Sequence, residues 1–197
     1  MRVFLGVTGA SGAPYAERLL RALAEADCEV GLTASGSGIE VLATELYGDP
    51  SLPREEVLER FVGGAKEKVT VYGEGDFKSP YASGSAQVDA YVICPCSMAT
   101  VGTLASGAMQ NLIHRAASVA IKERRKLVLV PRETPLSSIH LRGLATLHDA
   151  GATIVFAAPG FYHRPSSIGD LVDFIVARCL DQIGVPHSLS GRWGAES

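Results

Sequence analysis

The stretch from Lys122 to Pro135 has the clearest potential for chemistry. Its sequence predicts the end of a helix, then an apolar strand at 127–130, and then the polar pair Arg132 and Glu133. Open α/β sheets bind their ligands at the carboxyl ends of the strands. An arginine beside a glutamate at such a strand end can hold an anion and move a proton. The stretch therefore predicts a site for an anionic ligand.

A loop of small residues, Thr8-Gly9-Ala10-Ser11-Gly12, joins the first predicted strand to the first predicted helix. Glycine lets the backbone turn tightly and approach a ligand, and the free N–H groups of the following helix suit a phosphate. The loop is neither GxGxxG nor a Walker motif. Taken alone, it could equally be a simple strand-to-helix turn with Ser11 as its cap.

Two more polar loops follow predicted strands at the same edge of the sheet. They are Ser35–Ser37 and Ser97–Thr100. Each serine could be no more than a helix N-cap. Three such loops at one edge are better explained by a shared anionic ligand, as in the mononucleotide sites of flavodoxin-like folds.

Other candidate residues have ordinary explanations beside the functional ones. Arg115 and Lys122 lie seven residues apart and share one helix face, but a solvated charged stripe would look the same. Tyr162 lies in the segment 159–165, after the last predicted strand, and could serve acid–base chemistry. Four more side chains could be functional, or could be solvated, turn-forming or contact residues: Glu45, Ser83, Arg178 and Trp193.

The elements that must position these residues alternate between strand and helix along the whole chain. This alternation predicts an α/β fold, a three-layer parallel sheet of the flavodoxin/Rossmann type with helices on both faces. Strands are predicted at 3–7, 30–33, 69–72, 90–94, 127–130 and 153–156, and helices at 13–26, 39–46, 53–61, 99–105, 112–123, 139–150 and 168–183. We expect one domain over residues 1–197, with a long functional loop at 73–86 and an irregular tail at 184–197.

Composition excludes several classes of protein. The net charge of −3 argues against a nucleic-acid partner, and no apolar run is long enough to span a membrane. The apolar N-terminus leads directly into the Gly/Ser loop, so we interpret it as a buried strand and expect a cytoplasmic protein. The four cysteines and five histidines show no metal-ligand spacing and no CxxC pair, so no metal is expected. The cysteines are interpreted as buried, with a thiol of Cys94 or Cys96 lining a cofactor pocket as the alternative. The absence of G-x-S-x-G argues against a serine hydrolase.

Taken together, the motifs resemble those of the UbiX-type flavin prenyltransferases, formerly described as aromatic-acid decarboxylases. The resemblance runs from about residue 3 to residue 194. It rests on the segments 7–12, 43–45, 82–85, 93–97, 122–135, 159–165 and 192–193.

This resemblance implies a homo-oligomer, commonly a dodecamer, that binds flavin mononucleotide (FMN) near subunit contacts. It implies transfer of a dimethylallyl group from dimethylallyl phosphate to N5 and C6 of reduced FMN, without a metal. The prenylated FMN would serve a partner decarboxylase of the UbiD type. The tail at 184–197 would pack on a neighbouring subunit or on the active site.

The resemblance also implies roles for single residues. The matching cofactor positions are Gly9, Ala10, Ser11, Ser35, Ser97, Met98, Ala99, Thr100 and Arg132. Lys122, Tyr162 and Arg178 match positions that hold the substrate phosphate, with Arg115 nearby, Ser83 in the pocket and Trp193 closing it. The matching catalytic residues are Glu133, Ser11 and Glu45. Glu133 is the candidate acid–base residue and is expected to be buried against Arg132 and Lys122, while Ser11 and Glu45 would act at flavin N5.

Three alternatives remain open at this point. An FMN-dependent cysteine decarboxylase, such as the phosphopantothenoylcysteine enzyme, would need a histidine within residues 13–26 and a proline in the motif at 109–111, and both are missing. A flavin carrier would not need a second anion site. Direct aromatic-acid decarboxylation is the third. Gln110-Asn111 departs from the Asn-Asn or Asp-Asn of some relatives, which leaves the fine shape of the prenyl pocket open.

Overall fold

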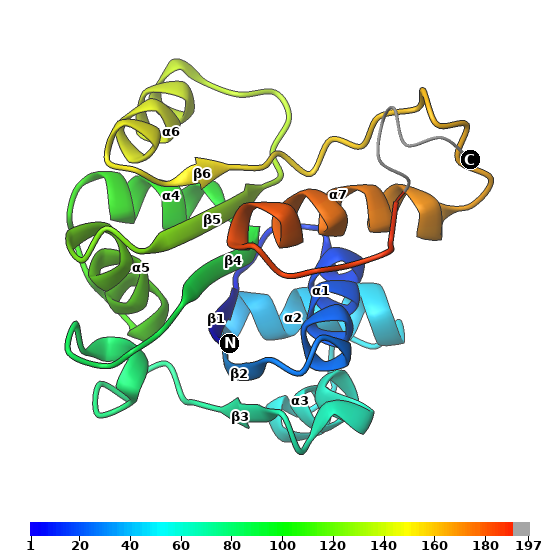
Figure 1. Cartoon of the computed structure of the whole chain (residues 1–197), viewed down its shortest axis with the longest axis horizontal. Coiled ribbons are helices and arrows are strands. Elements are labelled where there is room, and N and C mark those ends of the chain that lie inside the picture. Colours follow the sequence, from blue (N-terminus) through cyan, green and yellow to red (C-terminus); the bar gives the residue numbers. More distant parts are fainter. Residues whose placement is uncertain (191–197) are drawn as a thin grey trace.

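The structure is a computed structural model that describes residues 1–190, and it is built on a parallel six-stranded sheet (Figure 1). The strand order is β3-β2-β1-β4-β5-β6, the order of a doubly wound Rossmann-type sheet. The predicted α/β class is confirmed. The strands are β1 (Arg2–Val7), β2 (Glu29–Ala34), β3 (Val69–Val71), β4 (Ala90–Cys96), β5 (Lys126–Pro131) and β6 (Thr153–Ile154).

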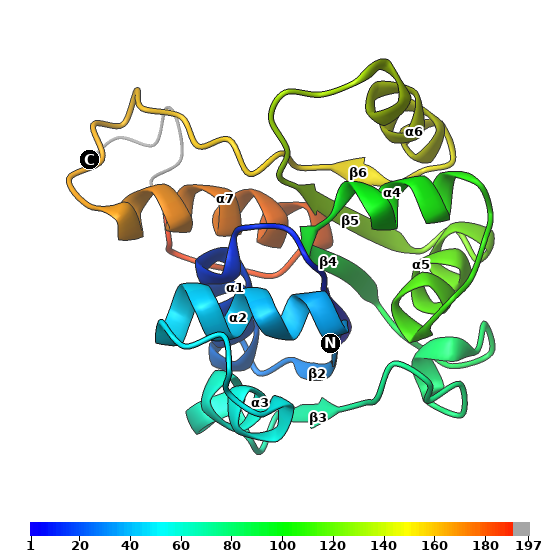
Figure 2. The same ribbon diagram turned by 180° about the vertical axis from the view of Figure 1, so that it is seen from behind.

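Helices cover both faces of the sheet, as Figures 1 and 2 show. One hydrophobic core lies under α1 (Ala13–Glu25), α2 (Gly36–Tyr47), α3 (Arg54–Val62) and α7 (Ile168–Ile183). The other core lies under α4 (Met98–Ala105), α5 (Leu112–Lys122) and α6 (Ser138–Asp149). The predicted elements are found within about three residues of their expected ends, and the largest difference is the start of α2, at Gly36 rather than at Ile39.

The central strands are buried on both sides, which explains their unbroken apolar sequences. In β4, Ala90 and Val92 belong to the core under α1 and α7, whereas Tyr91 and Ile93 belong to the core under α4 and α5. This is the alternation that a pleated strand imposes. The apolar N-terminus forms β1, whose residues 3–7 are all buried, as the sequence predicted.

The sheet has its topological switch point between β1 and β4, which are neighbours although β2 and β3 lie between them in sequence. The chain leaves β1 toward α1 on one face and leaves β4 toward α4 on the other. Two loops that part in this way open a crevice at the carboxyl ends of the strands, where ligands of such sheets bind.

Thr8 connects the two loops at this point. Its Oγ1 donates to the carbonyl oxygen of Pro95 at 2.9 Å and accepts from the main-chain N–H of Ser97 at 2.8 Å. The main-chain N–H of Thr8 also donates to Pro95, at 3.1 Å. Thr8 itself is buried. The spacing of the two loops is therefore set by hydrogen bonds and not only by the sheet.

The four cysteines are unpaired and buried, as predicted. Burial raises the pKa of the Cys96 and Cys179 thiols to about 12, so both stay protonated at neutral pH. Within residues 1–190, no helix has the length and apolar character that crossing a membrane requires.

Thr33 provides a test of the core. Its hydroxyl oxygen is buried and has no hydrogen-bond partner in the part of the chain described. We expect Thr33→Val to raise the free energy of unfolding by about 1 kcal/mol, because valine has the same shape and removes an unsatisfied polar group. Urea denaturation followed by circular dichroism measures the change.

Thr8→Val is the matched control, because it makes the same chemical change at a hydroxyl with two hydrogen bonds. This variant should lose about 1–3 kcal/mol of stability. A Thr33→Val protein that is as destabilised as Thr8→Val would contradict the prediction.

Candidate functional site

The N-terminus of α1 is closed by a carboxylate. Oε2 of Glu45 accepts hydrogen bonds from the main-chain N–H groups of Gly12 at 2.9 Å and Ala13 at 2.8 Å. Pro14 has no N–H group, and the N–H of Tyr15 donates to the carbonyl of Gly12 at 3.0 Å. The expectation that this helix offers free N–H groups to a phosphate was therefore wrong, because Glu45 on α2 already uses them.

The loops after β1 and β2 meet at Gly9. A Cβ atom at this position would lie 2.4 Å from Oγ of Ser37, which no side chain could tolerate without a shift. Oγ of Ser37 lies 3.2 Å from Oγ of Ser35, and Ser35 caps α2 by accepting from the N–H of Gly38 at 3.0 Å. The hydroxyl groups of the β2 loop thus border the Gly9 loop, as the sequence predicted.

The N-terminus of α4 remains open to an anion. Ser97 caps this helix by accepting from the N–H of Thr100 at 3.2 Å. In the described part of the chain, the main-chain N–H groups of Met98 and Ala99 have no hydrogen-bond partner. Free N–H groups and the positive end of the helix dipole together favour a negatively charged ligand.

Arg132 adds a charged hydrogen-bond donor for an anion at this edge of the sheet. Its Nε lies 3.4 Å from the carbonyl oxygen of Ser11, so its guanidinium reaches from the end of β5 to the β1 loop. Amides, hydroxyls and one arginine suit the phosphate of a mononucleotide, and Gly9 leaves room for close approach. The residues at this edge therefore fit the FMN that the resemblance implies.

Glu133, next to Arg132, makes a different contact from the one expected. Its Oε1 accepts from the main-chain N–H of Thr134 at 3.1 Å, and the residue is half-buried. Among residues 1–190 it forms no ion pair with Arg132 or Lys122. Both cations lie away from the Glu133 carboxylate. The Arg132 side chain turns toward the β1 loop, and Lys122 lies at the C-terminal end of α5.

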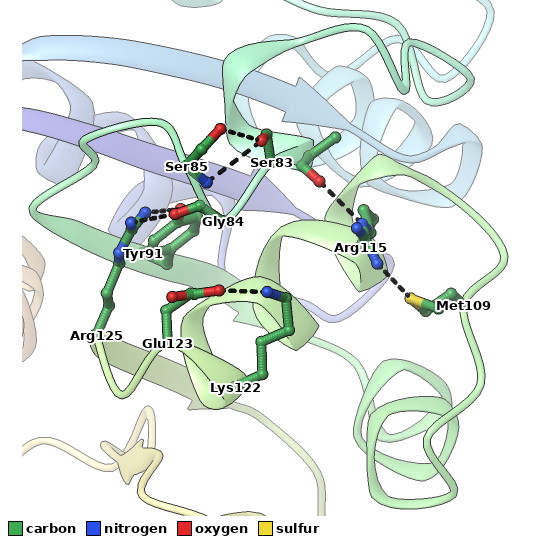
Figure 3. A network of polar contacts seen from close by, with 10 residues as sticks. Ser83, Gly84, Ser85, Tyr91, Met109, Arg115, Lys122, Glu123 and Arg125 are labelled. Carbon is green, nitrogen blue, oxygen red and sulfur yellow. Dashed lines mark hydrogen bonds and ion pairs between the residues drawn. The ribbon is translucent and has the colours of Figure 1, made fainter.

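Arg115 and Lys122 on α5 and Ser83 in the loop packed against this helix form one group, which we call the α5 cluster (Figure 3). Nε of Arg115 donates to the carbonyl of Ala82 at 2.9 Å, which holds the turn at 80–82 against the helix. Lys122 forms an ion pair with its neighbour Glu123. The cluster therefore presents two cations and one hydroxyl beside the long loop predicted at 73–86.

Tyr162 and Arg178 form a second group, which we call the α7 pair. The ring of Tyr162 packs edge-on against Phe174 of α7, with 5.8 Å between the ring centres. Arg178 follows Phe174 by one helical turn on the same face, and its Nη2 lies 2.5 Å from Oδ2 of Asp181. Tyr162 is 68% exposed.

The α5 cluster and the α7 pair do not meet within one chain. α5 covers one face of the sheet and α7 covers the other (Figures 1 and 2). The phosphate-binding set implied by the resemblance, Lys122, Arg115, Tyr162 and Arg178, is thus divided between two surfaces. Trp193 lies outside the described residues.

Sequence reasoning missed two residues that shape this edge. Thr8 was included in the Gly/Ser loop, but its link to the β4 loop depends on strand order, which the sequence does not display. Glu74 accepts from the N–H of Gly36 at 3.1 Å, at the start of α2. A single glutamate in a polar loop carries no recognisable sequence signal.

Comparisons with known proteins agree with this geometry. The family described as Flavoprotein matches residues 1–180. A flavin prenyltransferase UbiX of Pseudomonas aeruginosa is 48% identical over 200 residues, covering 99% of this chain and 95% of the relative.

Two solved structures extend the similarity to the fold. The dodecameric FMN-dependent UbiX-like decarboxylase of Escherichia coli O157:H7 is 37% identical, with a TM-score of 0.85, covering 99% of this chain and 100% of that one. AnUbiX (PadA1), in complex with FMN and dimethylallyl pyrophosphate, is 36% identical with a TM-score of 0.86, and the match covers 100% of this chain and 98% of that one. The chain therefore belongs to the flavoprotein family and, within it, to the UbiX flavin prenyltransferases.

Proposed function

We propose that this chain transfers a dimethylallyl group from dimethylallyl phosphate to N5 and C6 of reduced FMN, and that the prenylated FMN serves a UbiD-type decarboxylase. The observation that carries the proposal is the open N-terminus of α4 at the carboxyl edge of the sheet, the edge at which Arg132 also reaches the β1 loop. Family membership supports the reaction. The unpaired cysteines are typical of a reducing compartment, which supports the cytoplasm as the place of action.

Cofactor binding falls to the residues of the crevice. The N–H groups of Met98 and Ala99 and the hydroxyls of Ser35 and Ser97 would hold the nucleotide phosphate, with Thr100 beside them. Gly9, Ala10 and Ser11 would lie along the flavin, and Arg132 would add a positive charge. Reduced FMN, when bound, supplies the ring atoms that accept the dimethylallyl group.

The substrate phosphate needs cations that stabilise it as it leaves. Lys122, Arg115 and Arg178 can supply positive charge, and the Tyr162 hydroxyl can donate a hydrogen bond. Because these side chains lie on opposite faces of one chain, we propose that each site takes the α5 cluster from one subunit and the α7 pair from another. The dodecameric state of the E. coli relative supports an oligomer of this kind.

Proton movements fall to Glu133, Ser11 and Glu45. The Glu133 carboxyl group, just after β5, would take the proton released at flavin C6 when ionised, or give its own proton to the leaving phosphate oxygen when protonated. Glu45 fixes the Gly12–Ala13 turn through two hydrogen bonds and so places the Ser11 hydroxyl, which would exchange a proton at N5. In this proposal Glu45 affects the proton transfer only indirectly, by holding the loop that carries Ser11.

Mass spectrometry of the flavin tests the reaction class. Anaerobic incubation of the protein with reduced FMN and dimethylallyl phosphate should add one five-carbon unit to the flavin. Unmodified flavin would instead support a carrier. The diphosphate should be tested in parallel, because AnUbiX was crystallised with dimethylallyl pyrophosphate.

Release of carbon dioxide from a phenolic acid, without a partner enzyme, would support the decarboxylase alternative. The E. coli relative carries the name decarboxylase, so this assay belongs beside the flavin measurement.

Gly9→Ala tests the cofactor crevice. The added methyl group would displace Ser37 and raise the dissociation constant for FMN by about tenfold, because overpacking costs on the order of 1–3 kcal/mol. Quenching of FMN fluorescence measures the constant. Gly36→Ala is the matched control, since a Cβ there meets no atom within 4 Å and should leave the affinity unchanged. Equal affinities for all three proteins would refute the placement.

Glu133→Gln tests the proton transfer, because glutamine keeps the size of the side chain and cannot ionise. We expect kcat to fall by about 100-fold or more, the usual contribution of a general acid or base. The dissociation constant for FMN should stay unchanged, because among residues 1–190 the Glu133 carboxylate hydrogen-bonds to Thr134 and not to the loops proposed to hold FMN. Normal turnover in this variant would remove Glu133 from the mechanism.

Mixed oligomers test the shared site. Lys122→Ala and Arg178→Ala should each abolish most turnover when expressed alone. Co-expressed, the two variants should regain roughly one quarter of the sites, since random assembly of a symmetric oligomer pairs an intact Lys122 with an intact Arg178 at that frequency. Steady-state turnover per subunit measures the recovery.

The control carries both substitutions on one chain, co-expressed with the wild type. A shared site again gives roughly one quarter of full activity, whereas a site built within one chain gives roughly one half. Absence of recovery in the first mixture, together with one half in the second, would place the functional Lys122 and Arg178 of each site in one subunit.

A further inference from the structure

Glu74 lies in the loop after β3 and has no part in the reaction proposed above. The residue is half-buried, and its two carboxylate oxygens reach two different helices. Oε2 accepts from the main-chain N–H of Gly36 at 3.1 Å, and Oε1 accepts from Nδ2 of Asn111 at 3.3 Å. One carboxylate therefore joins the start of α2 to the start of α5.

At α2, the contact falls beside the cofactor loop. Gly36 lies between Ser35 and Ser37, and Oγ of Ser37 lies 2.4 Å from the position that a Cβ of Gly9 would take. The N–H of Gly36 belongs to the first turn of the helix, where no main-chain partner is available. A carboxylate there is favoured by the helix dipole and fixes the direction in which the loop leaves β2.

At α5, the carboxylate of Glu74 contacts Asn111, the N-cap residue of the helix. Oδ1 of Asn111 accepts from the N–H of His114 at 3.0 Å and caps the helix, which leaves its Nδ2 to face Glu74. The carbonyl of Glu74 also accepts from the N–H of Leu112 at 2.7 Å. His114 is buried, and burial lowers its pKa, so it stays neutral beside this contact.

We propose that Glu74 is a positioning residue for the cofactor. Its carboxylate holds the Ser35–Ser37 loop in place through Gly36, and Asn111 holds the carboxylate. This explains the asparagine of the Gln110-Asn111 pair, whose amide has to cap α5 and donate to Glu74 at the same time. The inference rests on the proposed function only in that the Ser35–Ser37 loop contacts FMN.

The first experiment compares Glu74→Ala with the wild type in FMN binding, followed by fluorescence quenching. Loss of a charge-assisted contact at the loop should raise the dissociation constant by about tenfold. At saturating FMN, kcat should stay within about threefold of wild type, because the variant loses binding and not chemistry. A role in stability alone would lower the melting temperature and leave the FMN dissociation constant unchanged, and this result would overturn the proposal.

Asp76→Ala is the matched control. Asp76 lies in the same loop and carries the same charge, but among residues 1–190 its carboxylate accepts only from the N–H of Lys78 within its own turn, at 3.2 Å. Its FMN dissociation constant should equal that of the wild type. An equal rise in Asp76→Ala and Glu74→Ala would show that the charge of the loop matters and not the contact, and the proposal would fail.

A swap of the two groups provides the second experiment. Asn111→Asp keeps the cap but sets two carboxylates against each other, so FMN affinity should fall by about tenfold. Adding Glu74→Gln restores a donor and an acceptor in reversed order. The double variant should return to within about threefold of wild-type affinity. A double variant that binds FMN no better than Asn111→Asp alone would refute the link between the two helices.

The outcomes separate this inference from the proposed function. A wild-type chain that binds no FMN would overturn both. Normal binding by the wild type, with no change in Glu74→Ala and none in Asn111→Asp, would overturn the positioning role alone.

Discussion

The whole site depends on one side chain, Thr8, which ties the β1 loop to the β4 loop. These loops leave the sheet toward opposite faces, and the Thr8 hydroxyl bridges them through Pro95 and Ser97. Because Ser97 is the cap of α4, the same hydroxyl also fixes where the free N–H groups of that helix point. The spacing of the two loops and the position of the free N–H groups of α4 thus have a common origin.

Two helices that begin at this edge are closed by carboxylates, and a third is open. Glu45 closes α1 and Glu74 closes α2, whereas α4 is capped only by a neutral serine. An anion approaching the edge meets negative charge at two helix ends and a positive dipole at the third. For the proposed ligand, this arrangement would favour the end of α4 as the place for a phosphate among three helix ends that look similar in sequence.

The sequence predicted the fold well because the signals were local. Apolar runs, glycine loops and helical periodicity located β1, β4 and β5 and the polar loops that follow them. The sequence did not reveal which helix N-termini already have a hydrogen-bond partner for their N–H groups. The partner of Gly12, for example, is Glu45, which is 33 residues away. The separation of Lys122 from Arg178 depends on which face each helix covers, which follows from strand order and not from spacing in the sequence.

The placement of α5 and α7 on opposite faces has a consequence for how the protein would come into action. The residues proposed to hold the nucleotide all lie at one edge of a single polypeptide, whereas the proposed isoprenoid-phosphate site takes residues from two. A newly made subunit could thus be loaded with flavin while still unable to alkylate it. Dilution that separates the subunits would therefore stop turnover before the flavin dissociates. Prenyl transfer would depend on the assembled oligomer, whereas flavin binding would not.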